Sequence, residues 1–301
     1  MTVTMRNEKS LRTPHTTSPT PSFVRRGTAP SPYEGEGGGG VSTGALSRRE
    51  FLGLAGTALG ASLLAGCGSG GSFGLPPGGT YFAGSVAVGN GVGTVFVTLD
   101  NAAKPAALGV RLTAAALTNL PNTDTEYILA LPPQAAGSGF DHVGLDWNPQ
   151  GHPPPGVYDV PHFDVHFYQI SQAQRNAITA VGADRDIALL APPASAIPTD
   201  YVPTTDPVPT QGTHWIDPTA PEFHGQPFTV TFIYGFYNGQ MVFVEPMVTK
   251  AFLDSRASFT AAVKQPATYP RPGYYPTQYS VRYDAAAQEY HITLEGLVLR
   301  G

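Results

Sequence analysis

One stretch near the middle of the chain alternates polar and apolar residues without a break. Its polar positions are His162, Asp164 and His166, and a phenylalanine or a valine stands between them. A period of two is typical of a half-buried β-strand. A helix would also place both histidines on one face, but Ser171–Gln174 resembles a capping box, so a helix is expected only after Ser171. We therefore predict a strand that ends near Ile170.

Similar apolar runs, separated by turn residues, recur from about Thr80 to the C-terminus. Hairpin turns are predicted at Gly89-Asn90-Gly91, at Asn238-Gly239 and at 284–288. The further predicted strands are 80–88, 94–99, 127–131, 228–235, 240–244, 278–283 and 290–299. Short helices are expected over 172–180 and 252–263, while 106–120 fits either a strand pair or a short helix.

These elements predict a mainly β protein, with a single antiparallel β-sandwich or jelly-roll-like domain over residues 75–301 and one or two short helices. Residues 192–221 form a long loop rich in proline, threonine and aspartate, which holds His214 and Trp215. Loops of this length are usually either functional or disordered.

The first 46 residues have a different character. They are rich in serine, threonine, proline, glycine and basic residues and lack apolar periodicity, so we expect them to be disordered. Such a length before an export signal is unusual. One hypothesis is a mis-assigned start, in which translation begins at Val41; precursor peptides from Met1–Gly40 would rule it out.

Residues 47–66 have the features of an export signal. Ser47-Arg48-Arg49-Glu50-Phe51-Leu52 resembles the twin-arginine signal, and an apolar run of about 15 residues starts at Leu52. That run suits a signal peptide better than a membrane span. The twin-arginine machinery is therefore the expected transient partner during export, and it carries folded proteins.

Leu64-Ala65-Gly66-Cys67 resembles the bacterial lipobox. The resemblance implies cleavage before Cys67 and lipidation of this cysteine, and several acyl chains anchor a protein stably to a membrane. Residues 67–74 would then be the lipidated cysteine and a flexible tether. The expected location is the outer face of the cytoplasmic membrane, or the periplasm or outer membrane of a cell with two membranes.

Charge and cysteine content narrow the classes of function. From Gly68 onward there are 18 acidic against 10 basic residues, and an acidic body does not suggest nucleic-acid binding. Cys67 is the single cysteine, so the exported domain has no disulfide and depends on its apolar core. No GxSxG elbow, P-loop or convincing dinucleotide fingerprint is present.

Residues 141–170 contain four of the eight histidines and four aspartates. Alternate residues of a strand lie roughly 6.5–7 Å apart, so two neighbours among His162, Asp164 and His166 could bind one divalent ion, such as Zn, Mn, Fe or Cu. His162 and His166 would be about 13 Å apart, too far to share an ion without a bulge. The further ligand candidates, from other segments, are His152, His224 and Glu245.

Simpler interpretations compete with a metal site. Polar positions on a strand are often a solvated face or a hydrogen-bonded pair. Glu245 precedes a proline at the expected end of a strand, where a surface glutamate paired with Lys250 is the favoured interpretation and a metal ligand or catalytic base the alternative.

Three phrases of the sequence resemble a family of uncharacterised secreted bacterial proteins that includes a Thermus protein of a cell-envelope stress regulon. The phrases are Asp146–Pro149 with Gly151-His152, Gly156–Tyr168, and Tyr234-Gly235 through Glu245-Pro246-Met247. The resemblance implies that the polar stretch and the segment of Glu245 belong to one domain over roughly 80–300. It implies no particular activity.

The favoured hypothesis is an exported, lipid-anchored envelope protein without enzymatic activity. As a binding module it would use the polar stretch for a metal, a small ligand or self-association as a homo-oligomer, and as a structural module its polar residues would only satisfy one another. The alternative is a metal-dependent enzyme, hydrolytic or redox, that uses His162, Asp164 and His166 together with the other candidates.

Overall fold

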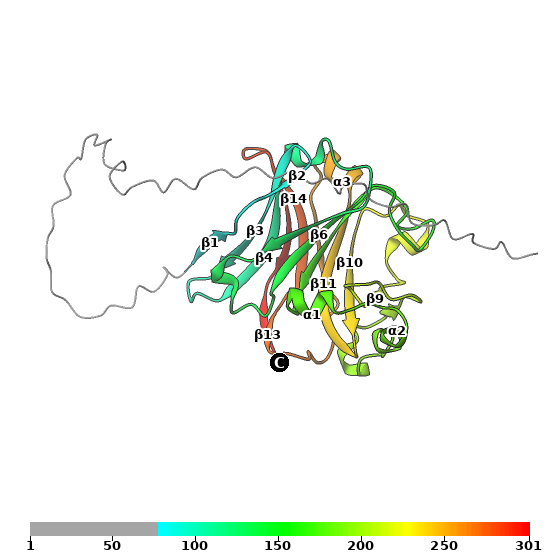
Figure 1. Ribbon diagram of the computed structural model, residues 1–301. Helices are drawn as coiled ribbons and strands as arrows, with labels where there is room; N and C mark the ends of the chain where they lie inside the picture. The colour runs from blue at the N-terminus through cyan, green and yellow to red at the C-terminus, as the bar shows by residue number, and fades with distance from the viewer. Residues whose placement is uncertain (1–77) are drawn as a thin grey trace, which may run out of the picture. The chain divides into compact units, whose positions relative to one another are not determined.

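Two antiparallel β-sheets face each other in the computed structural model, which describes residues 78–301 (Figure 1). The first sheet has the order β1-β3-β4-β15-β14-β12, with β2 paired to β3, and the second has the order β5-β6-β7-β11-β10-β9-β8. A small third sheet pairs β13 with β16. The strands are β1 (Gly79–Phe82), β2 (Val86–Val88), β3 (Gly91–Leu99), β4 (Pro105–Thr113), β5 (Thr125–Ala130), β6 (His142–Asn148), β7 (His162–Tyr168), β8 (Val202–Pro203), β9 (Thr213–Ile216), β10 (Val230–Tyr237), β11 (Gln240–Thr249), β12 (Phe259–Ala262), β13 (Gly273–Tyr275), β14 (Gln278–Asp284), β15 (Glu289–Glu295) and β16 (Val298–Arg300).

Helices are short and lie at the ends of the strands. The α-helices are α1 (Gln172–Asn176), α2 (Ala183–Ala188) and α3 (Lys250–Ser255), and the 3₁₀ turns are η1 (Ala114–Leu117), η2 (Pro133–Ala135), η3 (Ala194–Ala196) and η4 (Pro221–His224). In Figure 1, α3 lies at the upper end of the strands and α1 and α2 at the lower end. None of the helices within 78–301 has the length and apolar character needed to cross a membrane.

The main core lies between the two large sheets. Val110 of β4 and Ile292 of β15 come from the first sheet, and Leu145 of β6 and Val165 of β7 come from the second; all four are fully buried in one cluster. Alternate residues of each strand thus point into a shared interior, as in a sandwich of two sheets. The prediction of a mainly β, antiparallel fold is confirmed.

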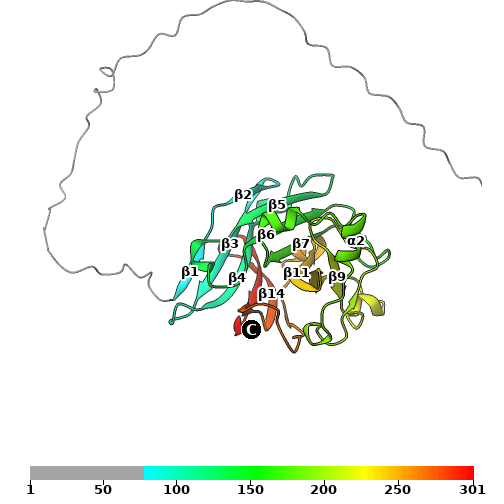
Figure 2. The same cartoon turned by 60° about the horizontal axis from the view of Figure 1, so that its bottom comes forward.

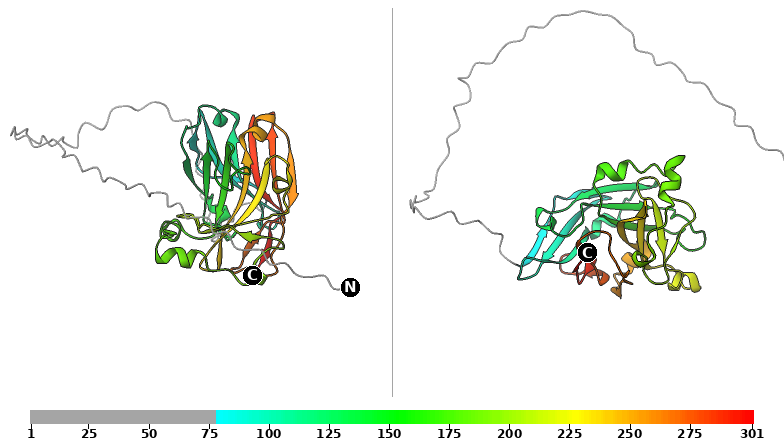
Figure 3. Two further views of the ribbon diagram at one scale, coloured as in Figure 1. Left: turned by 90° about the vertical axis from the view of Figure 1, so that its right-hand side faces the viewer. Right: turned by 90° about the horizontal axis from the view of Figure 1, so that it is seen from below.

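The second sheet is also covered on its other face, by connecting segments that include residues 149–161 and 217–229 (Figures 2 and 3). Tyr158 and Phe228, from these coverings, pack against Ile233 and Met247 of the sheet. Every residue of β7 is consequently buried. The expectation of a half-buried strand with a solvated polar face is wrong, because long connections form a third layer over this sheet.

The turn signals of the sequence locate three hairpins correctly. β2 pairs with β3, β10 with β11, and β14 with β15. The capping box is present as well, because the Ser171 hydroxyl accepts a hydrogen bond from the Gln174 backbone and the Gln174 side chain accepts one from the Ser171 backbone. Residues 106–120 are one strand followed by a 3₁₀ turn, not a strand pair or an α-helix.

Other element bounds differ from the predictions. The helix expected over 172–180 ends at Asn176, and the helix expected over 252–263 is replaced in its second half by β12. β11 continues through Glu245 to Thr249, so this glutamate lies inside a strand and not at its end. The predicted disordered segment, export signal and lipidated Cys67 all lie outside the described residues.

Candidate functional site

Three neighbouring strands of the second sheet align the polar residues of its covered face. β7 pairs with β6 on one side and with β11 on the other. In this register Asp164 stands between Asp146 of β6 and Met247 of β11, and His162 stands opposite Asn148. Polar side chains that are distant in the sequence therefore converge in the layer between the sheet and its covering loops.

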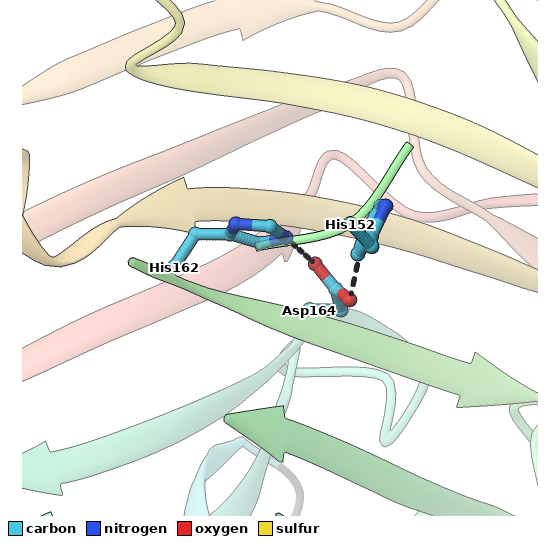
Figure 4. Close-up of side chains that lie close together, drawn as sticks. All are labelled: His152, His162 and Asp164. Carbon is cyan, nitrogen blue, oxygen red and sulfur yellow. Dashed lines mark ion pairs between the residues drawn. The ribbon is translucent and has the colours of Figure 1, made fainter. Parts of the chain in front are cut away.

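A first group, made of His152, His162 and Asp164, forms around one carboxylate (Figure 4). His162 Nε2 lies 3.1 Å from Asp164 Oδ1, and His152 Nε2 lies 3.3 Å from Asp164 Oδ2. The ligand atoms of all three side chains lie within 4.8 Å of one another. Asn148 Nδ2 also donates a hydrogen bond of 2.7 Å to Asp164 Oδ2, which fixes the carboxylate.

The loop after β6 brings His152 over Asp164. Gly151 has a φ of +68°, and a Cβ at this position would lie 2.1 Å from the Tyr158 carbonyl oxygen, so only glycine fits. The His152 backbone N–H donates to the same carbonyl oxygen at 3.1 Å. The tight return of this loop thus depends on Gly151.

Both histidines of the first group direct Nε2 toward the carboxylate. His162 Nδ1 lies 2.6 Å from the Val160 carbonyl oxygen, and His152 Nδ1 lies 2.8 Å from that of Pro153. Because a carbonyl oxygen only accepts, Nδ1 carries the proton in each ring, and in the neutral form Nε2 has the free lone pair. Backbone contacts of this kind orient metal-binding histidines in proteins.

The contact between His162 and Asp164 is a close ion pair that lacks the geometry of a good hydrogen bond. Although His162 Nε2 and Asp164 Oδ1 are 3.1 Å apart, neither atom has a hydrogen-bond partner among the described residues. His162 is fully buried and Asp164 is 4% exposed. Buried polar atoms without partners are rare and call for an explanation, such as an ion between them.

Electrostatics in the first group favour a charged carboxylate. Burial would raise the pKa of Asp164, but the neighbouring His162 and His152 hold the pKa well below its ordinary value. Burial would also lower the pKa of His152, but its contact with Asp164 raises that pKa to about 9. Without a metal ion, a proton on His152 therefore compensates the charge of Asp164 near neutral pH.

A second group, made of His166, His214 and Glu245, lies farther along the same face. His166 Nε2 is 3.5 Å from Glu245 Oε1, and His214 Nε2 is 3.5 Å from Glu245 Oε2. On the other side of its ring, His166 Nδ1 lies 3.1 Å from Asp146 Oδ2. Phe243 packs against both histidine rings, with centroid distances of 4.7 and 5.3 Å.

Burial dominates the electrostatics of the second group. It raises the pKa of Glu245 to about 8 and lowers that of His214 to about 3. Burial would lower the pKa of His166 as well, but the charges of Glu245 and Asp146 outweigh burial and raise this pKa to about 9. His214 is thus neutral and has a lone pair on its ring, which is the form that binds metals.

A cavity of about 740 Å³ adjoins both groups. His152 and Asp164 of the first group line it, and so does His214 of the second. Glu126 and Arg175, which form an ion pair, belong to the same lining. An ion held by the first group would therefore be accessible from a space large enough for a small molecule.

Each group supplies two histidines and one carboxylate. This ligand set occurs in catalytic zinc sites, which leave a fourth position open, and in non-haem iron(II) sites. For the first group, the cavity beside His152 and Asp164 could supply water or a small ligand to such an ion.

The structure divides the predicted site residues between the two groups. His162 and Asp164 come together with His152, whereas His166 is joined to Glu245 instead. Glu245 is 1% exposed, and Lys250 pairs with Asp254, so the interpretation of Glu245 as a surface residue paired with Lys250 is wrong. His224 joins neither group; its Nε2 lies 3.0 Å from the Pro218 carbonyl oxygen.

His214 was not among the predicted ligands. It lies on β9, inside the segment expected to be an irregular loop, and its partner in the register is Gly235 of β10. The alternation of His214 with the buried Thr213 and Trp215 is the only local signal for this strand, and four residues are too few to show a period.

Comparison with known protein families yields a partial match. Residues 100–147 match the model of the TTHB210-like family, described as hypothetical protein TTHB210, which links the chain to an uncharacterised Thermus family. No curated protein and no solved structure matches the chain. The matched segment runs from the end of β3 to β6 and so includes Asp146 but neither histidine group.

Proposed function

We propose that this protein is an exported, lipid-anchored envelope protein that binds a divalent transition-metal ion at His152, His162 and Asp164. The observation that carries the proposal is the convergence of two histidine Nε2 atoms on one buried carboxylate, with His162 Nε2 and Asp164 Oδ1 3.1 Å apart in an ion pair that lacks hydrogen-bond geometry. Ligands bonded to zinc at about 2.0–2.1 Å lie about 3.3 Å apart, close to this spacing.

Metal content tests the proposal directly. The full chain is purified without added metal and then dialysed against zinc, and its bound zinc is measured. The double variant His152→Asn/His162→Asn should bind at least one ion fewer than wild type. His224→Asn is the matched control, because this histidine is exposed and belongs to neither group. Equal metal content in wild type and double variant would refute the assignment.

The export part of the proposal rests on the twin-arginine pattern around Arg48 and Arg49 and on the lipobox that ends at Cys67. Cell fractionation tests it. The wild-type protein should be found in the membrane fraction with an acylated N-terminal cysteine, whereas Cys67→Ser should release an exported, soluble form. A membrane-bound Cys67→Ser protein would contradict the lipid anchor.

The cavity beside the first group supports a second candidate function, that of a metal-dependent enzyme. Three protein ligands leave a position open, and metal-bound water in such a position becomes nucleophilic near neutral pH. In this role Asp164 and the two histidines would hold the metal ion, the ion would supply an activated water, and the cavity would accept the substrate. A screen of the zinc- and iron-loaded protein with ester, phosphoester and amide substrates tests this candidate, and turnover must vanish in His152→Asn.

A further inference from the structure

The second group brings one carboxylate and two imidazole rings together in the interior. Glu245, His166 and His214 come from three different strands, β11, β7 and β9, and approach one another in a region where Glu245 and His166 are each 1% exposed. A buried carboxylate between two imidazoles is costly unless hydrogen bonds or an ion compensate it.

Hydrogen bonds do not satisfy this group. His166 Nδ1 lies 3.1 Å from Asp146, but His166 Nε2 and Glu245 Oε2 have no hydrogen-bond partner among the described residues. The two contacts of Glu245 measure 3.5 Å, which is too long for a strong charge-assisted hydrogen bond but leaves room for an ion between the atoms. The ligand atoms of the three side chains lie within 4.8 Å of one another.

We infer that His166, His214 and Glu245 bind a second metal ion, separate from the ion of the first group. His166 would bind through Nε2 and direct Nδ1 toward Asp146, and Gln211 donates a hydrogen bond of 3.3 Å to the same oxygen of Asp146. A carboxylate behind a metal-binding histidine fixes its tautomer and orientation. This inference goes beyond the proposed function, since its ligands are different side chains.

The two groups share no side chain. Each carboxylate also serves one group only. Asp164 directs its two oxygens at His162 and His152, and Glu245 directs its two at His166 and His214.

Equilibrium dialysis of the full chain against zinc, followed by elemental analysis, tests this inference. Wild type should bind two ions, His214→Gln one, His152→Asn one and the combined variant none. His224→Asn should still bind two. Circular dichroism of each metal-free variant checks that the β fold persists.

The outcomes separate the two claims. If His214→Gln binds as much zinc as wild type, the second site is refuted while the first stands. If His152→Asn binds as much zinc as wild type while His214→Gln binds less, the proposed function fails and the second site stands. Should His214→Gln not fold, His152→Asn decides, because one bound ion in this variant supports the second site and no bound ion overturns it.

Discussion

His152→Ala gives the sharpest test of the first metal site, because it removes one of three ligands without opening the core. The His152 side chain is 35% exposed, in contrast to the fully buried His162. Zinc should stabilise the wild-type protein markedly and this variant much less. The loss should appear as a smaller upward shift in Tm when zinc is added.

The size of the effect follows from ligand linkage. At a zinc concentration about 100 times the Kd, binding stabilises the folded state by about 2.7 kcal/mol. If the loss of one ligand weakens binding about 100-fold, the same concentration equals the Kd of the variant and stabilises it by about 0.4 kcal/mol. For a domain the size of Gly70–Gly301, 1 kcal/mol shifts Tm by about 2–4 °C.

Zinc should therefore raise the Tm of His152→Ala by roughly 5–9 °C less than that of wild type, as measured by differential scanning fluorimetry or calorimetry. A second ion would add equally to both proteins, so the difference isolates the first group. His224→Ala should show the full wild-type shift. An equal shift in wild type and His152→Ala would refute the ligand set.

Three further predictions concern the core, the second group and pH. Leu145→Ala removes a fully buried side chain between the sheets and should lower the free energy of unfolding by about 2–5 kcal/mol in urea titrations. Gly235→Ala places a Cβ 2.1 Å from the Phe243 ring, so it should lower the free energy of unfolding by about 1–3 kcal/mol and displace that ring from both histidines of the second group. Its control is Gly84→Ala, which should be neutral because the added Cβ meets no atom within 4 Å. The pKa of His152 is raised to about 9, so zinc must displace the proton of this histidine below that pH. The apparent zinc affinity of the first group should therefore rise about tenfold per pH unit from pH 6 to pH 9 and then level off. Isothermal titrations that show no rise would contradict the role of His152.

The sequence predicted the parts of the fold that depend on local signals. Turn residues such as Asn238-Gly239 located hairpins correctly, and Ser171 marked the start of α1. The strand that holds His162 was predicted from its alternation, which β7 confirms. Local chemistry sufficed for these elements because their causes lie within a few residues.

Burial could not be predicted in the same way. The polar face of β7 is covered by connections that pack Tyr158 and Phe228 over it, and nothing near His162 in the sequence indicates that covering. The solvated interpretation failed for this reason, and the surface interpretation of Glu245 failed because β11 continues past Pro246 in the middle of the sheet.

The grouping of candidate ligands was predicted in part. Strand geometry indicated that His162 and His166 are too far apart to share an ion, and the structure places them in different groups. The partners depend on the pairing of distant strands. His214 stands in a short strand within a proline-rich segment, and only the register of β9 against β10 brings it to Glu245.

The most direct measurement is the anomalous diffraction signal of zinc in crystals of the protein soaked with one to two equivalents of zinc. Binding at the first group predicts an anomalous peak about 2.0–2.2 Å from His162 Nε2, His152 Nε2 and an oxygen of Asp164. Crystals without a peak at this position, at a zinc concentration that saturates the protein in solution, would contradict the central claim.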